Sequence, residues 1–292
     1  MTLLAYQIFQ TVVEQGSFQR AAEVLNLTPS AISHAVSTAE KELGFPLFNR
    51  NKNGVTLTSY GENLQPYILT VLNSDAKLQQ AILEFNGLTH GSVKIGTFSS
   101  VCNSFIPELV TSFSKLHPNI EIKIYQGTYD DVYNWIKTGV VDLGFLSSSS
   151  CKDLPITALY EDELLCIVPK NFKPKNKKYI ELEELKEQKF VSQRESTDAD
   201  IQNLFQKYQL TIRSSCHVVD DLSTIAMVAA GLGVCIMPRL VMQNIPYEVN
   251  MYPLKPDEHR TIGICTLNEE FMAPAVKTMH KHILKYFKKI SE

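Results

Sequence analysis

The segment from Ser17 to Gly44 constrains the fold of this chain most, because it carries the start and stop signals of two short helices with almost no connection between them. Ser17 is a typical N-cap residue, and the helical pattern that follows it ends at Leu25. Thr28 is a second N-cap, Pro29 occupies the first position of the next helix, and Gly44 ends that helix. Two short helices joined by a tight turn are typical of a helix-turn-helix unit.

Apolar residues at helical spacing predict the core of this unit and of a helix that precedes it. The expected core positions are Leu4, Ile8, Phe9, Val12, Ile32, Val36, Ala39 and Leu43. Residues 49–58 have the pattern of two short strands with Asn53 and Gly54 at the turn, which predicts a β-ribbon wing. The pattern over residues 1–58 therefore predicts a winged helix-turn-helix domain.

Small polar side chains occupy the outer face of the second short helix, where they can reach base edges or phosphates. We expect Ser33 and His34 to face the major groove of double-stranded DNA, and Arg50 and Lys52 to contact phosphates from the wing. The expected DNA-binding residues are Ser17, Arg20, Thr28, Pro29, Ser30, Ser33, His34, Ser37, Arg50 and Lys52. Residues 17–58 hold four basic and three acidic side chains, so a head that binds a protein is the alternative.

Residues 59–87 carry one long amphipathic pattern. Apolar residues recur there at alternating spacings of four and three residues, with Asp75 in one position of the series. This spacing is typical of a coiled-coil seam and predicts a linker helix through which two copies dimerise. The expected dimerisation residues are Leu64, Ile68, Val71, Leu78 and Ile82. The alternative is that the stripe packs on the chain's own C-terminal domain, and we expect Pro66 in the first turns or at a kink.

From residue 91 onward, short apolar runs alternate with helical stretches, which predicts a parallel or mostly parallel α/β domain over residues 91–292. Ligands of open α/β domains bind at the carboxyl ends of strands, beside helix N-termini. Hydroxyl-bearing residues follow three of the expected strands, with one arginine among them that suits an anionic ligand. The expected effector-binding residues are Thr97, Ser99, Ser100, Ser147, Ser148, Ser192, Arg194 and Thr197. The expected ligand is a small polar or anionic metabolite, and helix capping is the alternative role of each cluster.

Many of these motifs occur together in one known family. They include Gly16-Ser17-Phe18, Arg20-Ala21-Ala22, Thr28-Pro29-Ser30-Ala31-Ile32-Ser33, Glu42-Leu43-Gly44, Pro46-Leu47-Phe48, Gly61-Glu62, His117-Pro118, Asp142-Leu143-Gly144, Val168-Pro169 and Gly231-Leu232-Gly233. In these motifs the chain resembles LysR-type transcriptional regulators over essentially its whole length. Many members of that family have Gln where this chain has Thr28, so the base preference is not carried over.

The resemblance implies a sequence-specific DNA-binding transcription regulator with a winged helix-turn-helix, a dimerising linker helix and an effector domain like periplasmic binding proteins. It also implies a homodimer or homotetramer, a small-molecule effector bound between two lobes, and RNA polymerase as a candidate partner. Because such effector domains cross twice between their lobes, we place the crossings near residues 161–165 and 265–268. Lobe one is then expected over residues 91–162 and 267–292, and lobe two over residues 163–266.

Composition and missing motifs argue against other classes of protein. The chain has no G-x-S-x-G, P-loop or H-E-x-x-H motif, so we expect no enzyme, no cofactor and no metal site. No apolar stretch approaches the roughly eighteen residues that span a membrane, and no signal-peptide pattern is present, so we expect a cytoplasmic protein without membrane contact. The six cysteines lack C-x-x-C spacing, which suits buried thiols. Cys102 and Cys216 leave a thiol-based redox-sensing regulator of the same fold as the alternative.

Overall fold

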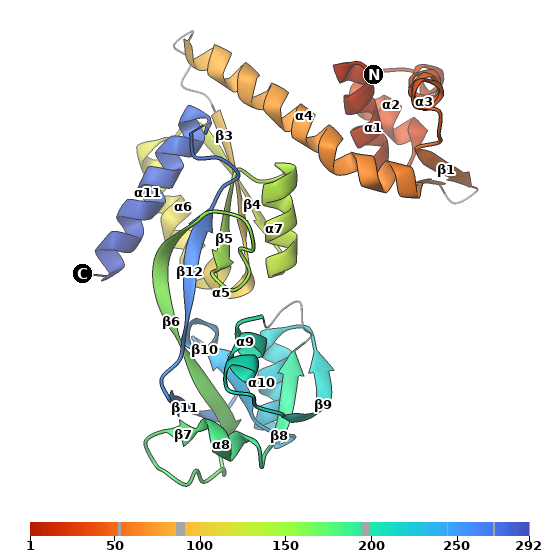
Figure 1. Cartoon of the computed structure of the whole chain (residues 1–292). Coiled ribbons are helices and arrows are strands. Elements are labelled where there is room, and N and C mark those ends of the chain that lie inside the picture. Colours follow the sequence, from red (N-terminus) through yellow and green to blue (C-terminus); the bar gives the residue numbers. More distant parts are fainter. Residues whose placement is uncertain (52–53, 86–90, 194–198, 244, 271, 292) are drawn as a thin grey trace. The chain divides into compact units, whose positions relative to one another are not determined.

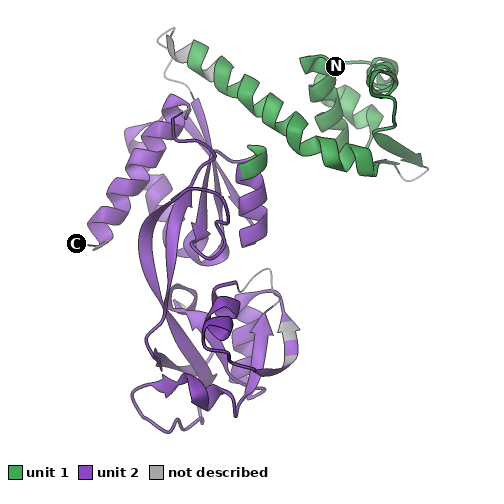
Figure 2. Cartoon of the chain, viewed as in Figure 1, with its two compact units in different colours: residues 1–88, 137–140 green, residues 89–136, 141–292 purple. Residues whose placement is uncertain are grey.

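A computed structural model describes residues 1–51, 54–85, 91–193, 199–243, 245–270 and 272–291 of the chain. The chain divides into two compact units, which Figure 2 colours separately. Residues 1–88 with 137–140 form the first unit, and residues 89–136 with 141–292 form the second. None of the described helices is long and apolar enough to cross a membrane.

The first unit begins with three helices and a two-stranded ribbon and ends in a long helix. Its elements in Figure 1 are α1 (Leu3–Gln15), α2 (Phe18–Leu25), α3 (Pro29–Leu43), β1 (Phe48–Asn51), β2 (Gly54–Leu57) and α4 (Ser59–Phe85). Ser17 Oγ accepts the Arg20 N–H, and Thr28 Oγ1 accepts the Ala31 N–H, so both predicted N-caps form. Gly44 ends α3 with φ at 81°, a left-handed conformation that favours glycine. The helix-turn-helix prediction is therefore confirmed.

The core of this unit lies between α1, α2, α3 and the start of α4. The buried positions that the sequence predicted are Ile8, Phe9, Val12, Ile32, Val36 and Ala39. The prediction for Leu4 is wrong, because this residue at the N-terminal end of α1 is 53% exposed. Leu43, at the end of α3, is only half-buried.

The first half of α4 belongs to this same core. Ile68 is 5% exposed and packs in the core, and Leu64 is partly buried against it. Assigning both residues to a dimer seam therefore needs correction, because the chain's own head already covers them. Pro66 lies inside α4 rather than in its first turn. Farther along the helix, exposed apolar side chains remain at Val71, Leu78 and Ile82.

The second unit is an α/β domain with two lobes. Lobe one holds β3 (Gly91–Thr97), α5 (Ser99–Ser104), α6 (Ile106–Leu116), β4 (Ile120–Gln126), α7 (Tyr129–Thr138), β5 (Leu143–Ser147), the first part of β6 (Ile156–Pro169), β12 (His259–Cys265) and α11 (Pro274–Ser291). Strands β4, β3 and β5 are parallel, whereas β12 is antiparallel to both β5 and β6. The expected mostly parallel sheet is therefore mixed. Figure 1 shows α6 and α11 side by side on one face of this sheet and α7 on the other.

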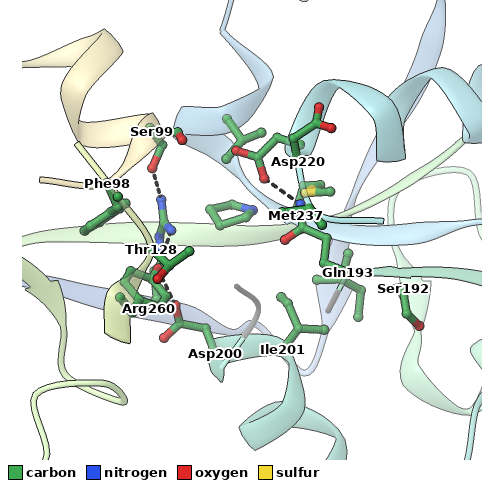
Figure 3. A pocket seen from close by; sticks show the side chains of 18 of the residues that line it. Phe98, Ser99, Thr128, Ser192, Gln193, Asp200, Ile201, Asp220, Met237 and Arg260 are labelled. Carbon is green, nitrogen blue, oxygen red and sulfur yellow. Dashed lines mark hydrogen bonds between the residues drawn. The ribbon is translucent and has the colours of Figure 1, made fainter. Parts of the chain in front are cut away.

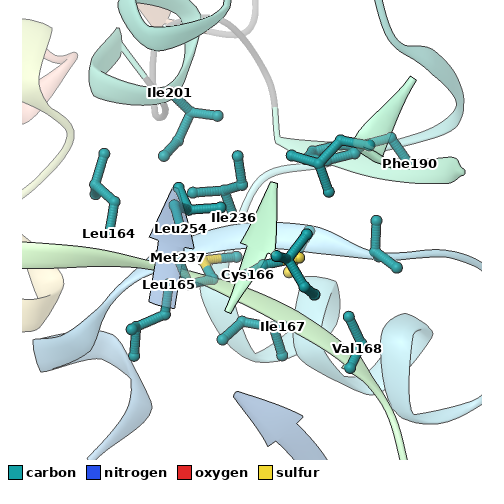
Figure 4. Packing of buried hydrophobic residues seen from close by; sticks show 14 of the residues in the cluster. Leu164, Leu165, Cys166, Ile167, Val168, Phe190, Ile201, Ile236, Met237 and Leu254 are labelled. Carbon is teal, nitrogen blue, oxygen red and sulfur yellow. The ribbon is translucent and has the colours of Figure 1, made fainter. Parts of the chain in front are cut away.

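Lobe two surrounds the second part of β6. It holds β7 (Ile180–Glu181), α8 (Leu182–Leu185), β8 (Lys189–Gln193), α9 (Ala199–Lys207), β9 (Arg213–Val218), α10 (Asp221–Ala229), β10 (Cys235–Pro238), the 3-10 helix η1 (Arg239–Met242) and β11 (Val249–Lys255). Its core packs around the apolar run from Leu164 to Val168, as Figure 4 shows, with Phe190, Ile236 and Leu254 as neighbours. The ends of the buried strands β8 and β10 face lobe one, where they line a cavity.

The chain crosses between the lobes along β6 and again before β12. The part of β6 up to Glu163 pairs with β12, and the part from Leu164 pairs with β10 and β11. This first crossing lies within residues 161–165, where the sequence placed it. The second crossing was placed wrongly at residues 265–268, since the chain returns between Lys255 and His259. Strand β12 belongs to lobe one because it is hydrogen-bonded between β5 and β6.

Ile68 offers a test of the packing of α4 on the head. We expect Ile68→Ala to lower the free energy of unfolding of the head by about 2–5 kcal/mol, because it leaves a cavity in the core. Leu4→Ala removes the same kind of side chain from an exposed position and should change stability by less than about 0.5 kcal/mol. Hydrogen exchange of the α1–α3 amides in the full chain measures both effects. Equal loss of protection in the two variants would contradict this packing.

Candidate functional site

A cavity of about 280 Å³ lies between the two lobes of the second unit. Lobe one lines it with the start of α5, the loop between β4 and α7, and Arg260 of β12. Lobe two lines it with β8, α9, the start of α10 and β10. Figure 3 shows side chains from both lobes turned toward this space. Strand ends and helix starts therefore meet there, as they do at the ligand sites of open α/β domains.

Arg260 and Asp162 form a buried ion pair beside the cavity. They lie directly opposite each other in the β6–β12 ladder and are 6% and 1% exposed. Arg260 Nη2 and Nε donate to the same Asp162 oxygen at 2.7 and 3.0 Å. The other Asp162 oxygen accepts the backbone N–H of Leu240 at 3.1 Å. Removing either charge would leave its partner buried without an opposite charge.

The burial of this pair shifts the ionisation of both groups. Desolvation raises the pKa of the Asp162 carboxyl, and the attraction of Arg260 offsets only part of that rise. Burial disfavours the charged form of Arg260 as well, but Tyr129, Asp162 and Asp200 together raise the pKa of the guanidinium above its ordinary value. Arg260 therefore stays charged and holds Asp162 in place.

Asp200 of α9 accepts hydrogen bonds from three hydroxyls of lobe one. Tyr129 Oη donates to it at 2.8 Å, Ser149 Oγ at 2.6 Å and Ser147 Oγ at 2.5 Å. Tyr129 Oη also accepts from Arg260 Nη1 at 2.8 Å. Burial raises the pKa of Tyr129 well above its usual value, so its hydroxyl remains a donor. One continuous network therefore joins the buried ion pair to the helix α9 of lobe two.

The start of α10 brings two more carboxylates to the cavity. Asp220 caps α10 by accepting the Ser223 N–H at 2.8 Å, and this bonding lowers the pKa of its carboxyl. Desolvation raises the pKa of the Asp221 carboxyl, and its bond from Gln193 Nε2 at 2.7 Å acts in the opposite direction. The bond from Gln193 and the charge of Arg260 therefore offset only part of the cost of burying the Asp221 carboxylate.

The hydroxyl clusters predicted to bind an effector are only partly at this cavity. Ser99, Ser100 and Ser192 line it, and Ser100 Oγ accepts a hydrogen bond from Arg260 at 2.8 Å. The other five predicted residues either lie away from the cavity or fall outside the residues that the structure describes. Thr97 is buried, Ser147 is bonded to Asp200 and Ser148 is exposed away from the lining, whereas Arg194 and Thr197 lie outside the described residues. Placing Thr97, Ser147 and Ser148 in the cavity therefore needs correction.

The sequence did not indicate the residues whose hydrogen bonds organise the cavity, namely the charged Arg260, Asp162 and Asp200 and the neutral Tyr129. A signal for two of them exists, since Asp162 and Arg260 each lie two residues before a largely apolar run, residues 164–168 and 262–265. Opposite charges at the same position of two strands indicate a cross-strand pair only when the strands are known to be neighbours. That pairing depends on tertiary structure.

The outer face of the head carries a second group of predicted residues. Arg50 of β1 lies against α3, where its Nη1 and Nη2 donate to Ser33 and Ser37, each at 3.4 Å. Its guanidinium also lies 4.8 Å from the Phe18 ring centre and 3.6 Å from the Glu40 carboxylate. Arg50 therefore joins the wing to α3, where it reaches two of the serines expected to meet DNA, Ser33 and Ser37.

The remaining predicted contacts of the head are placed as follows. Arg20, Thr28, Pro29, Ser30 and His34 are exposed. Ser17 is half-buried as the cap of α2, Thr28 Oγ1 lies 3.0 Å from Ser30 Oγ, and Lys52 lies outside the described residues. The start of α2, the start of α3 and the wing thus present polar groups that suit a nucleic-acid interface.

Two protein-family models match the chain. "Bacterial regulatory helix-turn-helix protein, lysR family" matches residues 3–62, and "LysR substrate binding domain" matches residues 86–288. Together they cover both units. The chain is also 28% identical over 267 residues to the "Uncharacterized HTH-type transcriptional regulator YvbU" of Bacillus subtilis (strain 168), which covers 90% of this chain and 91% of that protein.

Two solved structures share the fold. The effector binding domain of QuiR in complex with shikimate aligns with a TM-score of 0.61 and 24% identity, covering 68% of this chain and 98% of that one. Full-length CbnR complexed with its target DNA aligns with a TM-score of 0.66 and 18% identity, covering 98% of this chain and 99% of that one. At these identities the likeness shows the fold alone.

The buried ion pair can be tested by removing one or both charges. We expect Arg260→Met to lower the free energy of unfolding by about 3–5 kcal/mol, because Asp162 stays buried without its partner. The double variant Arg260→Met with Asp162→Leu should lose less than Arg260→Met alone. Urea unfolding followed by the fluorescence of Trp135, the single tryptophan of the chain, measures this difference.

The more exposed pair of Arg239 and Glu163 provides the control, since Arg239 Nε lies 2.8 Å from Glu163. Arg239→Met should cost about 1 kcal/mol or less. Additive losses in the Arg260 and Asp162 double variant would contradict the proposed dependence of each charge on the other.

Proposed function

Because the chain belongs to the LysR family of bacterial helix-turn-helix regulators, we propose that it binds a specific double-stranded DNA site as a dimer or tetramer and that a small molecule in the cavity between the lobes controls its binding. The observation that carries the proposal is the cavity of about 280 Å³ in the same chain as a helix-turn-helix head. We infer that the chain acts by binding rather than by catalysis, in the cytoplasm. RNA polymerase stays a candidate partner.

The geometry of the head supports DNA as the partner. The exposed start of α3 carries Ser30 and His34, and Arg50 sits beside Ser33 on the same side of the head. In helix-turn-helix proteins the N-terminal residues of the second helix contact base edges, while basic residues of a wing contact phosphates. We therefore keep Ser33 and His34 as the proposed base contacts and Arg50 as a proposed phosphate contact.

The exposed apolar series on α4 supports self-association. Val71, Leu78 and Ile82 are 43%, 57% and 43% exposed in the single chain. Apolar side chains at this spacing are covered when two helices form a coiled coil. Since one head carries little net positive charge, two heads on one DNA site would supply the affinity that one lacks.

The two-lobed domain provides the means of control. An effector can change DNA binding only through its different affinities for two arrangements of the lobes. Asp200 of α9 is hydrogen-bonded to Tyr129 and Ser149 of lobe one, so an occupant of the cavity would lie beside a direct contact between the lobes. We propose that effector binding changes the spacing of the heads in the oligomer rather than the structure of a head.

The cysteines do not favour the redox-sensing alternative. Burial raises the pKa of the Cys102 thiol, which lowers the fraction of reactive thiolate at neutral pH. Burial likewise raises the pKa of Cys265 to about 12. The thiol of Cys216 is half-buried on β9. The cavity, and not a reactive thiol, is therefore the better-supported sensor.

Arg50 and His34 offer a contrast between phosphate and base contacts. We expect Arg50→Ala to weaken binding to the specific site and to random DNA similarly, because it removes a positive charge that contacts a DNA phosphate. For the same reason the salt slope should fall by about 1. Arg50→Lys should restore most of that uniform loss. His34→Ala should instead reduce the preference for the specific site. Titrations at several salt concentrations measure these effects, and a sequence-selective loss in Arg50→Ala would reverse the assignment.

Leu78 offers a test of dimerisation through α4. We expect Leu78→Glu to abolish the dimer and tight binding of the DNA site together, because it places a charge in the apolar series. Gln79→Glu adds the same charge at the neighbouring exposed position and should leave both intact. Analytical ultracentrifugation and DNA titration measure the two properties. A monomeric Leu78→Glu protein that still binds the site tightly would refute this role.

A further inference from the structure

The charges that line the cavity are mainly negative. Among the described lining residues, Asp131, Asp200, Asp220 and Asp221 carry carboxylates, and Arg260 carries the one guanidinium. A carboxylate-lined cavity disfavours an anion, since like charges repel more strongly where water is excluded. Among the described lining residues, the balance of charge is therefore opposite to what an anionic effector needs.

Arg260 has little capacity left to bind an anion. A guanidinium has five N–H donors, and Arg260 directs them to Asp162 from two nitrogens, to Tyr129 at 2.8 Å and to Ser100 at 2.8 Å. Its charge is also paired with the buried Asp162 carboxylate. Arg260 therefore donates its hydrogen bonds within the internal network, and its charge offsets only part of the cost of burying the Asp221 carboxylate.

The carboxylates of the cavity differ in how many hydrogen bonds they already accept from the protein. Asp200 accepts from three hydroxyls, and Asp131 accepts the backbone N–H and the hydroxyl of Thr128 at 2.8 and 2.7 Å. Among the described residues, Asp221 accepts one side-chain hydrogen bond, which comes from Gln193. Desolvation raises the pKa of its carboxyl and the neighbouring Asp220 adds to that rise, whereas Gln193 and the charge of Arg260 offset it only in part. A positive charge beside Asp221 would relieve both effects.

Gln193 adds an independent observation. Its side chain is 9% exposed and lines the cavity. Nε2 donates to Asp221, whereas Oε1 accepts no hydrogen bond from any residue in the described part of the chain. Figure 3 shows the Gln193 amide directed into the cavity. Burying a carbonyl oxygen without a hydrogen-bond donor costs free energy. A ligand that supplies an N–H group to Gln193 Oε1 would therefore remove that cost.

The wall next to these acceptors is apolar. Val219, Ile236, Met237 and Val241 line the cavity from lobe two, close in the chain to α10 or within β10 and η1. Small-molecule sites commonly combine such a wall with a few polar groups that orient the ligand. The ligand that matches this side of the cavity has an apolar body and a donor-bearing end.

We propose that the effector is a small organic cation, an amine or a guanidine on an apolar body, whose N–H groups bind the Asp221 carboxylate and Gln193 Oε1. This inference rests on the proposed function, since it assigns a charge to the ligand of that same cavity. It replaces the small polar or anionic metabolite expected from the sequence. Asp220 adds a second negative charge at the start of α10, and the apolar wall packs against the body of the ligand.

Three probes that share a carbon skeleton and differ in end group test the charge. They are phenethylamine, phenethyl alcohol and phenylacetate, each added to the full-length protein in a thermal-shift titration and in calorimetry. We expect the amine to bind and to raise the melting temperature, because a ligand that binds the folded state stabilises it. The alcohol should bind more weakly, and the carboxylate should give no shift. Equal or tighter binding of phenylacetate, or no shift with the amine, would overturn the proposal.

Two variants locate the bound amine. Asp221→Asn removes the charge at nearly constant shape and should weaken amine binding by about tenfold to a hundredfold, the range for a hydrogen bond to a charged group. Asp257→Asn removes an exposed carboxylate between β11 and β12, outside the cavity, and should leave binding unchanged. Equal affinity of the Asp221→Asn and wild-type proteins would overturn the proposed site.

The DNA titrations of the wild-type protein use no probe, so they test the proposed function separately. Tight, sequence-specific DNA binding together with a preference for phenylacetate would reject the cationic ligand and keep the regulator. Absence of specific DNA binding would reject the regulator itself, whatever the probes do.

Discussion

The buried ion pair between Asp162 and Arg260 is the interaction on which the effector domain depends. The two residues face each other across β6 and β12 at the point where β6 leaves lobe one. Burying two charges is costly unless each finds its partner and further hydrogen bonds. The Leu240 N–H in lobe two donates a further hydrogen bond to Asp162. Ser100 and Tyr129 in lobe one accept further hydrogen bonds from Arg260. The pair therefore sets the positions of groups from both lobes around the cavity.

Two kinds of link join the lobes of the domain. One is the ladder of β6 and β12, which lies next to both crossings and holds the ion pair. The other is the contact made by Asp200, whose three hydroxyl partners all belong to lobe one. Under the function proposed above, a ligand between the lobes would act on this contact, and its different affinities for two lobe arrangements would set the size of the response.

The apolar stripe of the long helix α4 is buried in its first part and exposed in its second part. Ile68 and its neighbour Leu64 complete the core of the head, whereas Leu78 and Ile82 stay exposed in the single chain. A helix anchored in this way at its start transmits the position of its far end to the head. Under the function proposed above, this helix would connect an oligomer interface to the head.

The amino-acid sequence by itself determined the local elements and the family of this protein. The caps at Ser17 and Thr28, the stop at Gly44 and the buried stripes of α1 and α3 follow from short-range patterns, because helix starts and ends depend on residues within one or two turns. The same holds for the strands that alternate with helices from residue 91 onward and for the first crossing along β6. The pattern of hydroxyl-bearing residues that follow strands also indicated three residues that line the cavity, Ser99, Ser100 and Ser192.

Only the tertiary structure decided which residues meet. The pairing of β12 with β5 and β6 moved the second crossing, and it placed Arg260 opposite Asp162 across 98 residues of chain. Packing on the head removed Ile68 from the exposed seam, and Asp200 took up the hydroxyl of Ser147. These outcomes depend on contacts between distant segments, whose free energy no short-range pattern encodes. The sequence therefore determined the elements and the kind of protein, and long-range packing determined the chemistry of the cavity.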